Sequence, residues 1–209
     1  MRFIACILGA TGFALAPTAV NAQSISGEIG VFNQYLDDDL LPLTDKPVVQ
    51  AGIYIDVSKN CSLDVWGSHG INTSMGGELD VGGSCRFTTG ETEIEVSANR
   101  LFLRGLSDIT ALSISATRGP VKVEVEQYLW DNNPDATRIT AGYNIDVTEN
   151  FSLRPSLVYQ TGFGERDVFG GGASASYAIT KNLSIVGTLL TPFSGDRSTQ
   201  GSVGLNFTF

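Results

Sequence analysis

Acidic side chains recur at every second position in two stretches of the chain, and carboxylates at this spacing could act together on an ion or a solute. Glu91, Glu93 and Glu95 form one run, and Glu124 and Glu126 form the other. Residues two apart in an extended strand point to the same side, so each run predicts a row of carboxylates on one face. A carboxylate row that lines a water-filled passage favours cations.

Basic residues occupy the same phase of the pattern, which allows a second interpretation. They are Arg86, Lys122, Arg138 and Arg154. The acidic rows would then be part of an interior whose charges are solvated or ion-paired with one another. The sequence leaves both interpretations open, and neither requires a cofactor.

Two of the three cysteines, Cys61 and Cys85, lie on neighbouring predicted strands in the same phase. If those strands pair around a connection centred near residue 73, the two cysteines lie opposite each other. Opposed residues of antiparallel strands have Cα atoms about 4.5–5.5 Å apart, which is within disulfide range. We predict a structural disulfide at the rim, with two free thiols as the alternative. A metal site would need further Cys or His, and none is predicted.

The elements that must position these residues are hairpins. Residues 145–153 form an alternating apolar run, a three-residue polar turn and a second alternating run. The pattern recurs at 55–63 and more loosely at 177–185. Two tight turns at 89–90 and 119–120 fall between the first two copies, so the five turns are roughly 30 residues apart. This spacing indicates one up-and-down hairpin per repeat.

The phase of the apolar residues supports these hairpins. Paired positions keep their parity across a three-residue turn and switch it across a two-residue turn. Apolar residues are odd-numbered on both sides of the turns near 60 and 150. They change from odd to even around 89–90, and from even to odd around 119–120. The opposite phase is polar or small.

Residues 1–22 are typical of a secretory signal: Arg2 is followed by an apolar run and then by small residues before Gln23. Removing Arg2 leaves 12 of the 13 basic side chains against all 22 acidic ones, a net charge of −10. This balance argues against a nucleic-acid partner, because phosphate contacts need clustered Lys and Arg. The mature part, 23–209, is predicted to be one domain.

We predict an all-β fold, a transmembrane antiparallel up-and-down β-barrel of about 12 strands, with ten as the alternative count. Most strands have roughly 9–11 residues, enough to cross a bilayer at a tilt. Short turns would lie at one rim, and longer connections at the other: 36–46, 70–77, 102–107, 131–136, 163–167 and 193–198. A soluble barrel would put the apolar phase inside. That phase carries almost no charge, and twelve strands enclose a wide interior, so lipid is the easier environment for it.

The last predicted strand, 200–209, reads Val-x-Leu-x-Phe-x-Phe and includes Phe207 and Phe209. It resembles the closing strand of bacterial outer-membrane β-barrel proteins. The resemblance covers the mature chain as an architecture and indicates no subfamily. It implies export to the outer membrane of a Gram-negative bacterium, and Phe207 and Phe209 as a signal read by the barrel-assembly machinery. It also implies contacts with outer-membrane lipids and lipopolysaccharide, where the acidic run 37–39 could bind divalent cations or be merely solvated.

The function expected for such a chain is a porin-like channel that lets small polar solutes or ions diffuse through a narrow lumen. Barrels of 8 strands are filled by side chains and those of 16–18 hold water channels, so twelve strands is an intermediate case. A closed barrel with a structural or surface role is the alternative. An outer-membrane lipid hydrolase is a further alternative, because outer-membrane phospholipases combine a His, a Ser and an Asn at the outer rim, and His69 here is followed by a segment, 70–74, that contains Asn and Ser. Their His-x-Ser spacing is absent, so no catalytic residue is predicted.

Overall fold

The computed structural model describes residues 24–36, 42–73, 77–132, 134–163, 167–194 and 198–209. The predicted signal segment 1–22 and the acidic run 37–39 lie outside these residues. No helix that could span a membrane is present in the described part of the chain.

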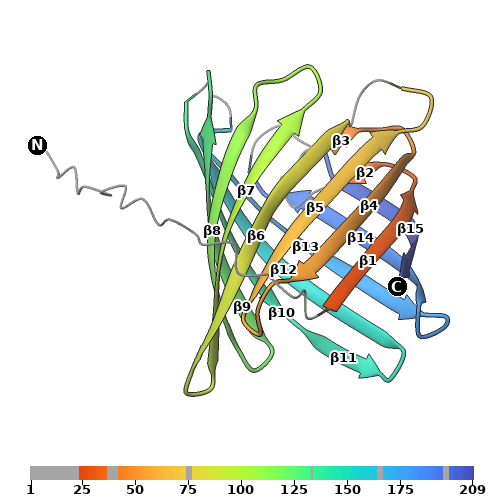
Figure 1. Cartoon of the computed structure of the whole chain (residues 1–209). Helices are drawn as coiled ribbons and strands as arrows, with labels where there is room; N and C mark the ends of the chain where they lie inside the picture. Colours follow the sequence, from red (N-terminus) through yellow and green to blue (C-terminus); the bar gives the residue numbers. More distant parts are fainter. Residues whose placement is uncertain (1–23, 37–41, 74–76, 133, 164–166, 195–197) are drawn as a thin grey trace, which may run out of the picture.

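The chain forms a closed antiparallel β-barrel (Figure 1). Neighbouring strands pair in chain order, β1 pairs with β15, and β10 pairs with β12. β10 and β11 both pair with β12 and count as one barrel strand, so the predicted number of twelve is confirmed. The barrel strands are β1 (Ser24–Phe32), β4 (Val48–Asp56), β5 (Cys61–Gly70), β6 (Glu78–Thr89), β7 (Thr92–Leu103), β8 (Ile109–Arg118), β9 (Val121–Trp130), β10 (Ala136–Tyr143), β11 (Ile145–Thr148), β12 (Phe151–Thr161), β13 (Val168–Ala178), β14 (Leu183–Pro192) and β15 (Gln200–Thr208).

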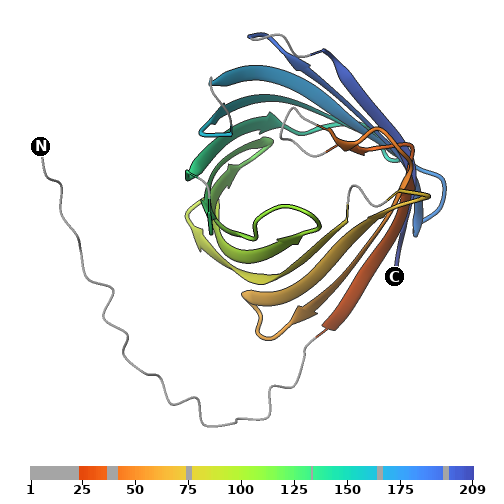
Figure 2. The ribbon, with the colours of Figure 1, turned by 90° about the horizontal axis from the view of Figure 1, so that it is seen from above.

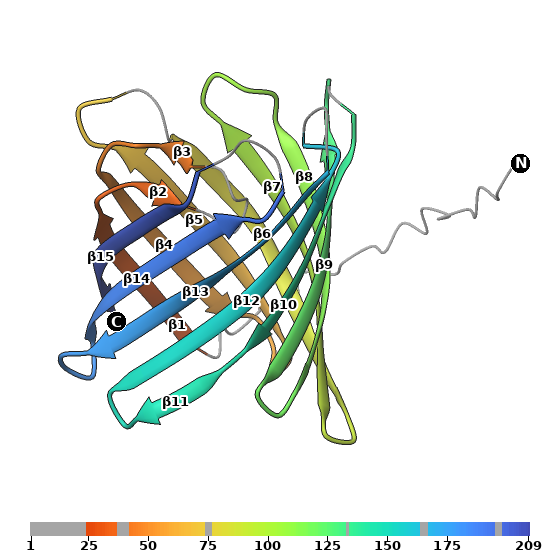
Figure 3. The same ribbon diagram turned by 180° about the vertical axis from the view of Figure 1, so that it is seen from behind.

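Short turns lie at one end of the barrel and longer connections at the other, and we call these the turn end and the loop end (Figures 1 and 3). Three turns share one hydrogen-bond pattern, which explains the repeat in the sequence. The hydroxyls of Ser58, Thr148 and Thr180 each accept a hydrogen bond from the backbone N–H of the asparagine two residues later. Such hydroxyl-capped turns hold the reversal in place.

The two tight turns depend on glycine. Gly90 and Gly119 have φ values of 60° and 56°, which disfavour residues with a Cβ. Thr89 pairs directly with Thr92, so the reversal is made by Gly90 and Glu91. Glu91 therefore lies in a turn, one residue before the strand in which the sequence analysis placed it.

The apolar phase faces outward, as predicted. Ile53, Val123 and Leu205 come from three separate parts of the barrel and are 50%, 41% and 50% exposed. In a soluble barrel these residues would be packed in the centre. The exterior of the cylinder is instead an apolar surface, and hydrocarbon is the solvent that matches it.

The first connection carries a small hairpin that the sequence analysis did not predict. It consists of β2 (Tyr35–Leu36) and β3 (Pro42–Thr44). Seen from above, this orange segment lies inside the ring of strands (Figure 2). Asn33 pairs with Val203 of β15 through its backbone and side chain, and the Ser202 hydroxyl donates to the Gln34 carbonyl. These bonds fix the start of the hairpin to the barrel wall.

The inward phase is less uniformly polar than predicted. Near the loop end it carries a cluster of apolar and aromatic residues from β7 to β10: Ile109, Ala111, Tyr128 and Ala136, with Leu101, Leu103 and Trp130 packed against them. A second cluster, Val158, Val168 and Leu190, lies on β12 to β14. The lumen near the loop end is therefore partly lined by apolar side chains.

Candidate functional site

Ionisable side chains of the lumen gather on one side of the barrel. β6 to β10 carry most of them, and we call the inward residues of these strands the charged wall. β13, β14 and β15 carry no Asp, Glu, Lys, Arg or His, and we call their inward residues the neutral wall. In the ring of twelve strands β7 and β14 are six strands apart, so the two walls face each other across the lumen.

Inward carboxylates outnumber inward cations among the described strand residues. The cations are Arg86, Lys122, Arg138 and Arg154. The carboxylates are Glu28, Asp56, Asp64, Glu78, Asp80, Glu93, Glu95, Glu124, Glu126 and Asp146. Ten carboxylates against four cations leave the lumen acidic.

Three predicted lumen carboxylates are ion-paired. Arg86 Nε contacts Glu95, which is its direct partner on β7. Lys122 Nζ lies 2.8 Å from Glu124 on the same strand.

The third pair is the most enclosed. Arg138 Nη2 is 2.5 Å from Glu126 Oε2, and the two side chains are only 10% and 18% exposed. The interpretation of an internally paired interior thus applies to these carboxylates.

The remaining predicted residues behave differently. Glu93 makes no ion pair with a described residue and is exposed to the lumen at the turn end. Glu91 lies in its turn, is 81% exposed, and contacts Arg118 at 2.9 Å on the rim. Arg154 lies over Gly142, and its Nε has no hydrogen-bond partner among the described residues. The acidic row is therefore shorter than predicted.

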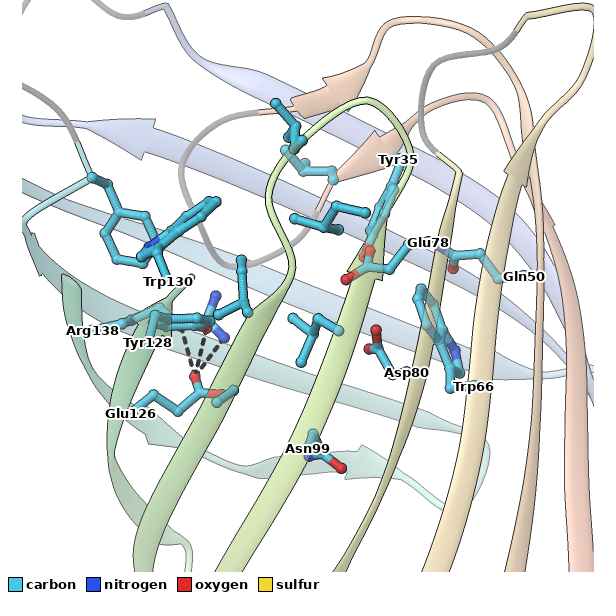
Figure 4. A pocket seen from close by; sticks show the side chains of 17 residues that line it. Tyr35, Gln50, Trp66, Glu78, Asp80, Asn99, Glu126, Tyr128, Trp130 and Arg138 are labelled. Atoms are coloured by element: carbon cyan, nitrogen blue, oxygen red, sulfur yellow. Dashed lines mark hydrogen bonds and ion pairs between the residues drawn. The ribbon is translucent and has the colours of Figure 1, made fainter. Parts of the chain in front are cut away.

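A cavity of about 510 Å³ occupies the loop end of the lumen (Figure 4). Tyr35, Trp66, Glu78 and Asp80 lie on one side, and Tyr128, Trp130 and the Glu126–Arg138 pair lie on the other. Trp66 and Asp80 are direct cross-strand partners, so both point into the cavity from adjacent strands. The guanidinium of Arg138 lies 5.4 Å from the centre of the Tyr128 ring.

The β2 segment narrows the lumen between opposite parts of the barrel. The Tyr35 hydroxyl donates a hydrogen bond to the Glu78 carboxylate, and its ring centre is 5.9 Å from that of Trp66. Its neighbour Leu36 packs against the Val158–Val168–Leu190 cluster of β12 to β14. Because β5 and β6 lie across the ring from β12 and β13, two consecutive residues contact both sides of the lumen.

Further cavities continue toward the turn end. One of about 220 Å³ is lined by Glu28, Trp66 and Asn206. Another, of about 600 Å³, is lined by Asp146, Arg154 and the serines of β13. Open volume is therefore present on both sides of the β2 constriction.

Two loop aspartates have lowered pKa values for different reasons. Hydrogen bonds from the Arg100 guanidinium, at 2.5 Å and 3.1 Å, lower the pKa of Asp131. Hydrogen bonds from the hydroxyls of Thr161 and Tyr159 lower the pKa of Asp167. A charged donor therefore anchors the loop after β9, and neutral donors anchor the loop before β13.

The predicted disulfide joins Cys61 to Cys85, which are direct cross-strand partners. The predicted assembly residues Phe207 and Phe209 stack with ring centres 6.4 Å apart. The Phe209 backbone also forms two hydrogen bonds of 2.9 Å with Gly27 of β1. These contacts place Phe209 on the seam that closes the barrel; recognition by the assembly machinery stays a prediction.

His69 lies at the loop end of β5, opposite Val49 and in the outward phase. Among the described residues it makes no hydrogen bond to a hydroxyl or carboxylate, so no Ser–His pair is assembled there. No cluster of three or more potential metal ligands occurs in the described part of the chain.

Sequence reasoning missed the residues that shape the cavity at the loop end: Tyr35, Trp66, Glu78, Tyr128 and Trp130. A signal was present for Tyr128 and Trp130. The stretches 101–103 and 128–130 are apolar or aromatic in both phases, so part of each must face inward. Nothing in the periodicity indicated that Tyr35 and Leu36 fold into the lumen.

The fold is that of bacterial outer-membrane porins. The KdgM porin matches with a TM-score of 0.65 at 12% identity, over 88% of this chain and 99% of that one. The NanC porin matches with a TM-score of 0.60 at 4% identity, over 89% and 99%. The Acinetobacter baumannii outer membrane protein Omp33 matches with a TM-score of 0.54 at 16% identity, over 92% and 100%.

KdgM is also known in complex with disordered oligogalacturonate. No protein-family model matches the sequence, and no curated protein is significantly similar to it. At these identities the likeness extends to the fold.

Proposed function

We propose that this chain is an outer-membrane channel through which small neutral or cationic solutes diffuse passively. The observation that carries the proposal is the sorting of side chains by face. The exterior is apolar, whereas charged and hydroxyl groups line cavities of about 510 and 600 Å³ toward the two ends. The loop end would face outward and the turn end the periplasm, as in other barrels of this type.

The charge of the lumen supports the solute class. The lumen holds ten carboxylates and four cations, and Glu93 forms no salt bridge among the described residues. Acidic rings favour cations in pores of this kind. Oligogalacturonate, which KdgM accommodates, is a polyanion, and this lumen would repel it. The proposal for this chain therefore excludes acidic oligosaccharides as preferred solutes.

Planar bilayer recording of the purified full-length protein tests this proposal. We expect stepwise conductance increments, and a reversal potential in a KCl gradient that indicates a preference for potassium over chloride. Heat-denatured protein is the control for detergent artefacts. Absence of conductance from protein that still shows heat-modifiable migration in gels would overturn the channel.

The β2 constriction favours a second candidate, a closed barrel with a structural or surface-interaction role. Tyr35 and Leu36 contact opposite sides of the lumen, and this contact could block the passage. The double variant Tyr35→Ala, Leu36→Ala separates the candidates. Conductance that appears only in this variant supports the closed barrel, whereas a moderate increase over an already conducting protein supports the channel.

A further inference from the structure

We infer that the cavity at the loop end is a binding site for an organic cation with an apolar or aromatic body. This inference rests on the proposed channel function, because it names the solute that the channel mouth selects. The cavity volume of about 510 Å³ is within the range of roughly 300–1,000 Å³ that is usual for small-molecule sites.

The charge of the cavity is the first argument. Its described lining contains the carboxylates of Glu78, Asp80 and Glu126, with Arg138 as the cation. Arg138 donates to Glu126 through Nε and Nη2, and the face of its guanidinium lies over the Tyr128 ring. The guanidinium of Arg138 is thus held by Glu126 and Tyr128, and the net charge of the lining is negative.

The apolar surface is the second argument. Leu101, Leu103, Leu106 and Ile109 line the cavity beside Trp130 and Phe163. The Phe163 ring is packed edge-on against Tyr128 at 5.0 Å between ring centres. Inorganic cations gain nothing from such a surface, whereas an organic body buries apolar area against it.

Polar and aromatic groups meet on the same side of the cavity, which is the third argument. Trp66 and Asp80 face inward as direct partners on β5 and β6, with the Tyr35 ring beside Trp66. An ammonium group at this point would meet both a carboxylate and an aromatic face, and aromatic faces attract cations within about 6 Å. Deeper in the cavity, Asn99 Oδ1 is buried without a hydrogen-bond partner among the described residues. It lies over Gly82 and provides a further acceptor.

The charge of the lining separates the organic cation from other solutes. An anion would be repelled by the excess of carboxylates. A neutral sugar can form hydrogen bonds with the lining, but it gains nothing from the net negative charge. A cation that carries N–H donors or a methylated ammonium, with a ring attached, matches the charge, the acceptors and the aromatic surface together.

Tryptophan fluorescence can test this inference directly, because the chain has two tryptophans and both line the cavity. The folded protein in detergent is titrated with benzyltrimethylammonium, with benzyl alcohol as the neutral probe and with phenylacetate as the anionic probe. We expect a saturable fluorescence change with the cation, a response at least tenfold weaker with the alcohol, and none with the anion. An equal response to all three probes, or none to the cation, overturns the inference.

Two variants locate the binding. Asp80→Asn should weaken the affinity for the cation by about tenfold, because it removes the negative charge beside Trp66. Glu93→Gln, a lumen carboxylate at the turn end, is the matched control and should leave the affinity unchanged. Trp66→Leu should weaken binding as well, which covers the case in which Asp80→Asn fails to fold. Equal affinities for Asp80→Asn and wild type would overturn the assignment.

Conductance separates this inference from the proposed function. Benzyltrimethylammonium added to the loop side should reduce the potassium current in a saturable manner. A conducting protein without probe binding overturns the cation site and leaves the channel intact. Probe binding without any conductance overturns the channel and leaves a cation-binding barrel.

Discussion

The two walls of the lumen solve the same structural problem by different means. Inward residues of the charged wall satisfy one another through ion pairs such as Arg138–Glu126. Inward residues of the neutral wall carry no charge, and their polar members use hydroxyl contacts such as that between Ser174 and Thr188, at 3.2 Å. The difference concentrates the charge of the lumen on one side, so a cation in the lumen is attracted toward that side.

The largest expected effect is on stability. Replacing Arg138 with Met removes the guanidinium that donates two hydrogen bonds to the enclosed carboxylate of Glu126. We expect the free energy of unfolding to fall by about 3 kcal/mol. Urea titration of the folded protein in detergent measures this change.

The matched control on the neutral wall is Ser176→Ala. It removes a hydroxyl that makes no side-chain hydrogen bond with the described residues, and we expect a change within about 0.5 kcal/mol. Equal losses of unfolding free energy in Arg138→Met and Ser176→Ala would mean that the ion pair contributes no more to stability than the hydroxyl does.

The disulfide is the second test, since it adds a covalent link on the side of β5 and β6 that the neutral wall lacks. We expect the double variant Cys61→Ala, Cys85→Ala to lose about 2–3 kcal/mol of unfolding free energy. Comparing oxidised and reduced wild-type protein by the same titration should give a similar difference. A reductant that also destabilises the double variant would show that the loss has another origin.

Ion selectivity is the third test. Glu93→Gln should lower the potassium-to-chloride permeability ratio by about twofold, because it removes a lumen carboxylate that forms no salt bridge among the described residues. Ser176→Asp places a carboxylate on the neutral wall and should raise the ratio. Reversal potentials in a KCl gradient measure both. If Ser176→Asp has no effect while Glu93→Gln does, ions pass along the charged wall alone.

The smallest effect concerns the two loop aspartates. A lowered pKa in the folded state means that each anchor stabilises the fold above the ordinary pKa of aspartate and is lost as pH falls through the lowered pKa. High salt should raise the pKa of Asp131 toward its ordinary value, because its main donor is the charged Arg100. The pKa of Asp167 should move less, because its donors are neutral. Carboxylate NMR titrations at two salt concentrations provide the measurement, and equal shifts would contradict this explanation.

Much of the barrel could be predicted from the sequence because its physics is local. Alternation places Ile53 and Val123 on the apolar face of the sheet whatever the rest of the chain does, and the near absence of charge on that face predicts that it is the outer one. The Ser58, Thr148 and Thr180 turns form from their own residues. The pairing of Cys61 with Cys85 followed from phase and loop length. Glu91 was misplaced by one residue, since a two-residue turn can begin at either of two positions.

The cavity at the loop end could not be predicted in the same way. Tyr35 and Leu36 form a strand of two residues, which is too short for any periodic signal. Their position depends on Glu78 and on Val158, which are more than 40 and 120 residues away in the sequence. The apolar lining was missed for a different reason: the alternating pattern assigns apolar residues to one face, and only 101–103 and 128–130, which are apolar in both phases, indicate that some of them face inward.

The pairing of β1 with β15 also has a kinetic consequence. Glu28 and Asn206 are hydrogen-bonded across this pairing although 178 residues separate them in the sequence. Contacts between such distant segments form slowly, because the intervening chain must be ordered before they gain anything. We expect the cylinder to remain an open sheet through most of its folding, and its two unpaired margins to be the surfaces that most need protection from other chains until they meet.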